Sequence, residues 1–318
     1  MQGHINGSIN GQIMGHNNGH IKGHNNGQIR GHINCIAHNS SEGRLLAGDV
    51  KTAVVDCGMA FCAPQTIKNI KNALGPKPLD YIFITHTHYD HVGALPLFRR
   101  EWPGVRLVAS ELSAALLLKN TPRRFMREFS AIAASQYGGV VFTDYDDDEF
   151  HADIIINENE SVPLGGISVE AVAGPGHTRD SMCYFVPELE LLMLNETPGV
   201  LIPDGTMYPC YLTGFRDAIE TIEKCRRIGS GVLSLPHRGI IDADETKGFF
   251  DRALETNYTC RDFIMKMLDD GLGEPEIVES MKQKYYNETL SGYQPEAAFI
   301  TNAKALIACT ARECGKEG

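Results

Sequence analysis

The chain has 318 residues, enough for one large domain with an appendage, and its 40 acidic and 29 basic side chains give a net charge of −11. Because nucleic acids and anionic membranes are bound through clustered Lys and Arg, this charge argues against either as a partner. The nine cysteines include no Cys-x-x-Cys pair, and no stretch suits a membrane span or signal peptide, so we expect a cytoplasmic protein with free thiols.

Residues 1–34 form a low-complexity repeat in which glycine recurs at every fourth position from Gly3 to Gly31. That period matches neither a helix face nor a strand face, and the few isoleucines cannot form a core. We therefore expect residues 1–34 to be disordered and without a catalytic part. The five histidines of the repeat also permit metal scavenging, an alternative that rests on composition alone.

Short strands separated by turns are expected after the repeat, at residues 35–37, 44–47 and 52–56. Residues 64–74 then predict a helix. The next segment, residues 79–85, is apolar and rich in β-branched and aromatic side chains, so it predicts a buried strand.

A cluster of metal-binding side chains follows this strand in the sequence Thr-His-Thr-His-Tyr-Asp-His-Val-Gly, residues 85–93. Imidazole and carboxylate are ligands that suit zinc, iron or manganese. Because alternate residues of an extended segment point to the same side, His86 and His88 can bind one metal. A helix that begins near Asp90 would reverse the chain and present Asp90 and His91 to a second metal. A chance cluster of solvated residues is the alternative, and four residues of ligand type in this order after a strand argue against it.

The segments beyond the motif alternate between helices and strands. We expect helices at 92–101, 110–119, 122–134 and 213–228, and strands at 105–109, 153–156, 161–163, 167–173, 182–186, 191–194 and 231–235. Two groups of strands with helices outside favour an α/β fold in which two packed sheets lie between helices. The metal ligands would then lie in loops at one edge of the sheets, where a substrate can enter.

The motif resembles the hallmark of the metallo-β-lactamase superfamily of binuclear hydrolases, His-x-His-x-Asp-His at the end of a core strand. Two later residues match as well, His177 in a Gly-His-Thr turn and His237 at a strand end. The resemblance implies an αββα sandwich with two metal sites. It implies His86, His88 and His177 as ligands of the first site, and Asp90, His91 and His237 as ligands of the second.

One position departs from the pattern of that superfamily. An aspartate after a glycine usually bridges the two metals, whereas this chain has Asn195-Glu196-Thr197 at the matching place. Glu196 can still bridge, although its extra methylene moves the carboxylate. The resemblance also implies that Asp56 buttresses the metal loop, which agrees with the need of metal-bound histidines for a partner on the other ring nitrogen. An ordinary Asp at a turn is the alternative.

The last part of the chain predicts helices at 244–269, 274–286 and 295–310. This extension resembles that of the quinolone-signal response thioesterases, in which C-terminal helices lie over the metal cleft; the catalytic part also resembles glyoxalase II-like members. Packing on a remote face or a homodimer interface is the alternative. We therefore expect three parts: the repeat 1–34, a catalytic domain 35–241 and a helical extension 242–318.

The resemblance implies a hydrolase that binds two divalent metal ions, with zinc expected first and iron or manganese as alternatives. Two adjacent cations lower the pKa of a shared water and polarise the group under attack. We predict hydrolysis of an ester, thioester or lactone of a small acyl substrate, with Asp90 guiding the proton as the resemblance implies. A phosphodiesterase, which the acidic charge disfavours, and a non-catalytic metal-binding regulator are the alternatives.

Overall fold

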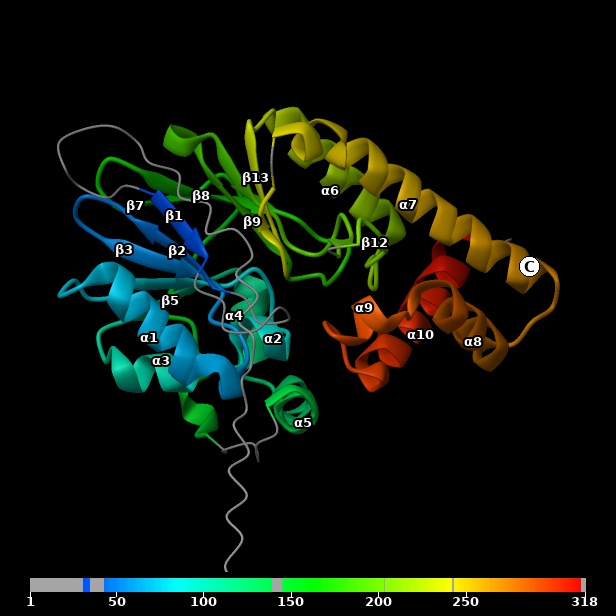
Figure 1. Ribbon diagram of the computed structural model, residues 1–318, viewed down its shortest axis with the longest axis horizontal. Helices are drawn as coiled ribbons and strands as arrows, with labels where there is room; N and C mark the ends of the chain where they lie inside the picture. The colour runs from blue at the N-terminus through cyan, green and yellow to red at the C-terminus, as the bar shows by residue number, and fades with distance from the viewer. Residues whose placement is uncertain (1–30, 35–42, 139–144, 203, 242, 316–318) are drawn as a thin grey trace, which may run out of the picture.

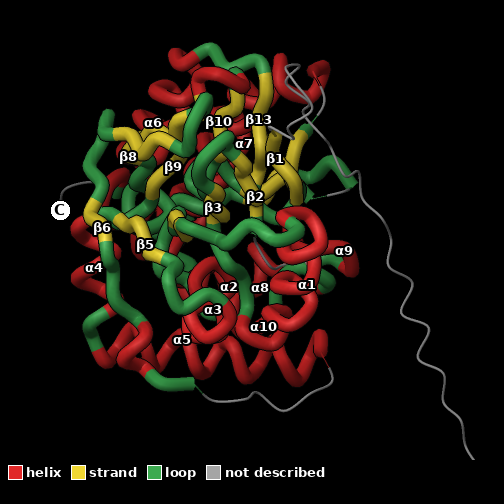
Figure 2. Tube along the Cα trace, turned by 90° about the vertical axis from the view of Figure 1, so that its left-hand side faces the viewer, coloured by secondary structure: helices red, strands yellow, loops and turns green. Residues whose placement is uncertain are grey.

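The computed structural model describes residues 31–34, 43–138, 145–202, 204–241 and 243–315. Residues 1–30, for which we expect disorder, and the strand expected at 35–37 lie outside this part. Figure 1 shows two sheets with helices on both outer faces, and Figure 2, turned by 90°, shows the strands surrounded by helices. The layers are helix, sheet, sheet and helix, so the predicted αββα sandwich is confirmed.

The first sheet has six strands in the order β1-β2-β3-β4-β5-β6. They are β1 (Gly31–Asn34), β2 (Arg44–Ala47), β3 (Thr52–Val55), β4 (Tyr81–Phe83), β5 (Arg106–Ala109) and β6 (Ile154–Ile155). Strands β1 to β3 pair antiparallel and β3 to β6 pair parallel. Because β3 and β4 are parallel neighbours, the residues that follow them, Asp56 and Thr85, meet at one edge of the sheet.

Strand β1 corrects the expected boundary of the N-terminal repeat. Its four residues pair with β2 in antiparallel register, although we expect residues 1–34 to be disordered. A strand edge offers backbone donors and acceptors whatever the side chains are, so a polar, glycine-containing segment can join a sheet that it could not form alone. The folded part therefore includes the end of the repeat.

The second sheet has six strands in the order β14-β13-β10-β9-β8-β7. They are β7 (Ser161–Pro163), β8 (Ser168–Ala173), β9 (Met182–Val186), β10 (Leu191–Met193), β13 (Val232–Leu235) and β14 (Gly239–Ile240). Only β10 and β13 pair parallel. Apolar side chains of both sheets form one buried layer, in which the rings of Phe83 and Tyr184 lie 5.2 Å apart.

Helices cover the two outer faces. Helices α1 (Ala63–Leu74) and α3 (Leu95–Glu101) pack on the first sheet, and α6 (Phe215–Ile228) and the start of α7 (Ala243–Asp269) pack on the second. The helix expected at 92–101 begins later, at Leu95 of α3, and a separate one-turn helix, α2 (Tyr89–Val92), precedes it. The N–H of Ala94 donates to the carbonyl of Gly58, which ties the segment after the motif to the loop after β3.

Helices α4 (Glu111–Leu117) and α5 (Asn120–Ala133) follow β5. The side chain of Ser110 caps α4 by accepting the N–H of Ser113. Four shorter helical segments are Ala60–Cys62, Ala134–Gly138, Asp147–Glu149 and Pro187–Leu189.

The C-terminal helices share a core of their own. They are the second half of α7, α8 (Glu274–Tyr285), α9 (Glu288–Ser291) and α10 (Glu296–Cys314). Tyr208 and Tyr211 join this core, so the C-terminal helices pack directly on the segment that follows Glu196. That segment contains a short hairpin of β11 (Val200–Leu201) and β12 (Met207–Tyr208).

The helices and the cysteines of the described part can be compared with the expectations from the sequence. None of its helices has the length and apolarity required to cross a membrane. All eight of its cysteines are free thiols, as expected, and seven of them are buried.

Candidate metal centre

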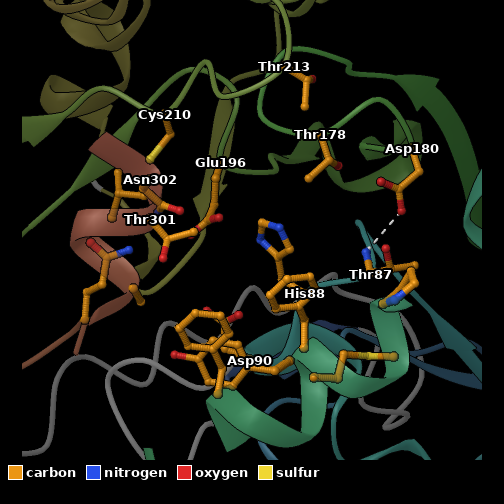
Figure 3. Close-up of a pocket in the computed structure, with 18 of the residues that line it drawn as sticks. Thr87, His88, Asp90, Thr178, Asp180, Glu196, Cys210, Thr213, Thr301 and Asn302 are labelled. Atoms are coloured by element: carbon orange, nitrogen blue, oxygen red, sulfur yellow. Dashed lines mark hydrogen bonds between the residues drawn. The ribbon is translucent and has the colours of Figure 1, made fainter. Parts of the chain in front are cut away.

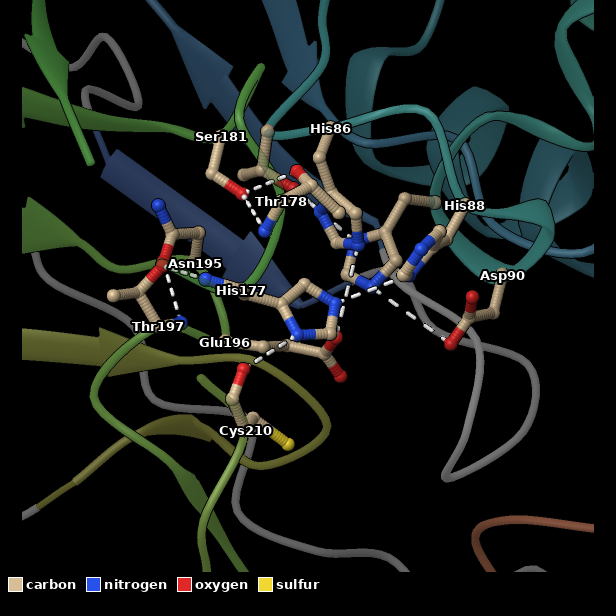
Figure 4. A network of polar contacts seen from close by, with 12 residues as sticks. His86, His88, Asp90, His177, Thr178, Ser181, Asn195, Glu196, Thr197 and Cys210 are labelled. Atoms are coloured by element: carbon tan, nitrogen blue, oxygen red, sulfur yellow. Dashed lines mark hydrogen bonds and ion pairs between the residues drawn. The ribbon is translucent and has the colours of Figure 1, made fainter. Parts of the chain in front are cut away.

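All seven ligand-type residues predicted from the sequence meet at one edge of the two sheets. Their ligand atoms form two groups, within each of which every atom lies within 4.8 Å of the others. The first group is His86, His88, His177 and Glu196, and the second is Asp90, His91, Glu196 and His237. Figure 4 shows the rings of His86, His88 and His177 and the carboxylate of Glu196 turned toward one another.

The atoms of the first group are close enough to share one cation. His177 Nε2 lies 3.1 Å from His88 Nδ1 and 2.6 Å from Glu196 Oε2, which is 3.7 Å from His86 Nε2. Ligand atoms bound at 2.0–2.1 Å to tetrahedral zinc are about 3.3 Å apart. The group therefore has the dimensions of a metal site.

The second group shares the carboxylate of Glu196 with the first. The other oxygen of Glu196, Oε1, lies 2.6 Å from His237 Nε2. Asp90 Oδ2 lies 3.8 Å from the Nε2 atoms of both His91 and His237. His237 adopts a left-handed backbone conformation with φ of 60°, a strained geometry of the kind that clusters at functional sites.

The electrostatics of the centre fit divalent cations. The Nε2 atoms of His86 and His91 are buried and have no hydrogen-bond partner among the described residues, an arrangement that costs about 1–3 kcal/mol for each group unless something else binds there. Burial and the neighbouring histidines lower the pKa of His86 well below its usual value and that of His88 to about 3. Both rings are therefore neutral and offer a lone pair, as metal binding requires.

Partners on the other ring nitrogen orient the ligands. His91 Nδ1 lies 3.0 Å from Asp56 Oδ2, and His177 Nδ1 lies 3.0 Å from the carbonyl oxygen of Cys210. When these Nδ1 atoms carry the proton, the Nε2 atoms face the centre as acceptors. Burial lowers the pKa of His91, but the carboxylates of Asp56 and Asp90 outweigh it and raise that pKa to about 10, so metal binding there displaces a proton.

Asp56 contacts Arg44, Thr85 and His91 in a buried network beneath the histidine motif. This position agrees with the expectation that it supports the loop that carries the motif. It is fully buried, adopts φ of 61°, and accepts a hydrogen bond from Arg44 Nη2 at 2.9 Å and one from the N–H of Thr85 at 2.7 Å. Burial favours the neutral acid, yet His91, Arg44 and Thr85 outweigh it and hold the pKa of Asp56 below its usual range. Arg44 also donates to the carbonyl of Leu194 at 3.0 Å, which joins the two sheets.

The turn that carries His177 is held by the turn that carries Glu196. The N–H of His177 donates to Thr197 Oγ1 at 3.0 Å, and Asn195 Nδ2 donates to the carbonyl of Gly174 at 2.9 Å. A Cβ on Gly174 would collide with that same Asn195 amide, and Gly176 has φ of 135°, a region that only glycine enters readily. These contacts explain the two glycines that precede His177.

Asp180 is a residue that the sequence did not single out. It is buried, and its Oδ2 accepts the N–H of Thr87 at 3.1 Å and the hydroxyl of Ser113 at 2.9 Å. Since Thr87 lies between His86 and His88, its hydrogen bond to Asp180 fixes the backbone between the two histidines. The only available signal was a carboxylate three residues after His177, a position that by itself says nothing about burial.

A pocket adjoins the centre, and residues of the C-terminal helices line it. Its walls include Asp90, Glu196 and His237 together with Leu290 of α9 and Asn302 of α10. Figure 3 shows Asn302 and Thr301 on one side of this pocket, with Glu196 and His88 between them and Thr87. Of the places considered for the C-terminal helices, the structure thus has α9 and α10 beside the candidate metal centre.

Comparisons with known proteins agree with this architecture. A family model described as the metallo-beta-lactamase superfamily matches residues 45–195. A metallo-beta-lactamase fold-containing protein of Sulfurisphaera tokodaii is 23% identical over 202 residues, 62% of this chain and 72% of that protein. A hydroxyacylglutathione hydrolase of Bartonella tribocorum is 28% identical over 142 residues, but these are only 43% of this chain and 42% of that enzyme. The structure of a metallo-beta-lactamase family protein of Thermus thermophilus has a TM-score of 0.58 at 18% identity over 86% of this chain and 88% of that one, which shows the shared fold.

Proposed function

The chain belongs to the metallo-β-lactamase superfamily, and on that premise we propose that it is a metal-dependent hydrolase of a small ester, thioester or lactone. The reaction adds water across the acyl bond and gives a carboxylic acid with an alcohol or thiol, or a single hydroxy acid when the substrate is a lactone. The observation that carries the proposal is the position of Glu196, whose two oxygens lie 2.6 Å from His177 Nε2 and 2.6 Å from His237 Nε2. One carboxylate thus contacts both groups of ligands, as a bridging ligand must.

The proposed centre holds two divalent cations in the two groups of ligands. Zinc is the cation that we expect first, because imidazole and carboxylate are its usual ligands, with iron or manganese as alternatives. Bound there, the cations would lower the pKa of a water molecule and polarise the carbonyl that it attacks. The proposed ligands are His86, His88 and His177 for one cation, Asp90, His91 and His237 for the other, and Glu196 for both.

The protein's own residues supply proton transfer and enclosure. We propose that the carboxylate of Asp90 takes the proton of the attacking water and passes it to the leaving group. Its position in the pocket lining beside Glu196 and His237 supports this role. Cys210 also lines the pocket, but burial raises the pKa of its thiol well above the usual value. This thiol stays protonated, so the proposal needs no cysteine nucleophile.

The choice of an acyl substrate rests on charge and on the pocket. With a net charge of −11, the chain repels a polyanion, and a nuclease would need many phosphate contacts from Lys and Arg. The pocket is lined by apolar side chains such as Leu116 and Phe129, which suit the apolar part of a small organic molecule. Both features favour a small acyl compound over a nucleic acid.

A substrate panel tests this proposal. We expect the purified full chain to hydrolyse an acyl thioester, an aryl ester or a lactone faster than bis-p-nitrophenyl phosphate, and we expect a chelator to abolish that activity until zinc is restored. Spectrophotometric rates before chelation, after it and after zinc addition measure this. Turnover confined to the phosphodiester would assign the chain to the alternative class, and acyl turnover that survives chelation would refute the metal. Bound metal without turnover of any substrate would favour the regulator.

A second test concerns the bridging residue. Glu196→Ala should weaken the binding of a metal by about 10–100-fold or more, the cost known for lost support of a metal ligand, whereas Glu196→Asp should fold and keep part of the affinity because a carboxylate remains. Competition with a chelating dye measures the affinities. Glu188→Ala is the matched control, because Glu188 is exposed and its hydrogen bonds within the described residues go to Ser168. Parent-like binding of both metals by Glu196→Ala would show that Glu196 is no ligand.

A further inference from the structure

The pocket beside the metal centre is larger than a reacting acyl group requires. Its volume is about 590 Å³, within the range of roughly 300–1,000 Å³ that is typical of sites for small organic ligands. Figure 3 shows residues from three directions around it, with Asn302 of α10 on one side and Asp180 on the other. There is room for a chain attached to the acyl carbon.

One wall of this pocket is an apolar surface of helices α4 and α5. It consists of Leu112, Leu116, Phe125, Met126 and Phe129. Leu112 is 39% exposed and Phe125 is 46% exposed, so neither is used to build the core of the fold. Large apolar side chains that remain accessible inside a pocket indicate a surface for an apolar ligand.

The same two helices carry a second exposed apolar pair that does not line the pocket. Leu118, which directly follows α4, is 62% exposed, and Ile132 of α5 is 38% exposed. If the exposed apolar residues of α4 and α5 formed a face for another protein, both pairs would contribute. If they serve a ligand in the pocket, only Leu112 and Phe125 matter.

Because Leu112 and Phe125 are exposed inside the pocket, we propose that the substrate carries an apolar acyl chain that lies against them. This proposal rests on the proposed hydrolase function. The reacting carbonyl lies at Asp90 and Glu196, and the chain extends from it along α5. Each methylene buried on this surface contributes about 0.8 kcal/mol, a factor of about four in kcat/KM. The rate should therefore rise with chain length until the wall is covered.

The experiment compares p-nitrophenyl esters with acyl chains from acetyl to decanoyl on the full, metal-loaded chain. We expect kcat/KM to rise about fourfold for each of the first added methylenes. In the double variant Leu112→Asn with Phe125→Asn, the ratio of kcat/KM for the octanoyl ester to that for the acetyl ester should fall at least tenfold. The control Leu118→Asn with Ile132→Asn should keep the parent ratio. All four side chains are exposed, so the variants should fold.

Calorimetric binding of straight-chain carboxylates, the products of such a reaction, separates this inference from the proposed function. An affinity that rises with chain length in the parent, but not in the Leu112 and Phe125 double variant, supports the apolar subsite. If no ester is hydrolysed at the same time, the hydrolase function is refuted while the apolar subsite stands. The inference would be overturned if carboxylate affinity and kcat/KM did not change with chain length. It would also be overturned if both double variants showed the same dependence on chain length.

Discussion

Replacing His86 by alanine is expected to lower hydrolysis by more than about 100-fold and to remove metal from the first group of ligands. The side chain is fully buried, and its Nε2 has no hydrogen-bond partner among the described residues, so no neighbouring group compensates for its loss. Removing only the support behind a metal ligand costs about 10–100-fold in affinity or activity, and removing the ligand itself costs more. Elemental analysis and kcat/KM on the best substrate of the panel measure both effects.

His151→Ala is the matched control for this prediction. His151 is 45% exposed and lies 3.6 Å from Asp153, outside both groups of ligands. Its replacement should leave metal content and rate at the parent values. A His86→Ala protein that also keeps both would contradict the assignment of His86.

Replacing Asp56 by alanine is expected to have the largest effect on stability, a loss of about 3–5 kcal/mol in the free energy of unfolding. The change leaves the buried guanidinium of Arg44 without its carboxylate, and breaking a buried ion pair on one side costs about that much. It also removes the partner of His91 Nδ1, so metal affinity should fall by a further 10–100-fold or so. Urea unfolding of the metal-free and metal-loaded protein measures both.

Asp80→Ala separates loss of stability from loss of the metal site. Asp80 accepts hydrogen bonds from Lys51 Nζ at 2.7 Å and from the N–H of Thr52 at 2.9 Å, at the opposite end of β3 from Asp56. Lys51 is 42% exposed, so this loss should be smaller, and metal affinity should not change. Equal metal affinity in the Asp56 and Asp80 variants would show that Asp56 does not support the ligands.

The candidate ligands could be identified in the sequence because the motif that contains four of them is local. His86, His88, Asp90 and His91 lie within one short segment after a buried strand, and backbone geometry alone places alternate residues on one side. His177 and Glu196 stood out only through the resemblance to a family, since each is a single polar residue in a turn. The sandwich could be predicted because strands and amphipathic helices each have a characteristic spacing of apolar residues along the sequence.

The supporting contacts could not be predicted, because they arise only when distant segments meet. The carbonyl of Cys210 supports His177 through a backbone atom that no side-chain pattern reveals. Asp180 and Arg44 are charged residues that would ordinarily be exposed, and their burial depends on partners 67 and 150 residues away in the chain, Ser113 and Leu194. The place of α9 and α10 was equally open, because an apolar helix face suits a lid, a remote face or an interface alike.

Anomalous diffraction at the zinc edge, from crystals grown with zinc, tests whether the centre binds two metals. We expect two peaks about 3.5–4 Å apart, the spacing of two-metal hydrolytic sites, with Glu196 between them. One peak should be bound by His86, His88 and His177, and the other by Asp90, His91 and His237. A single peak, or peaks bound only outside these residues, would contradict a binuclear centre bridged by Glu196.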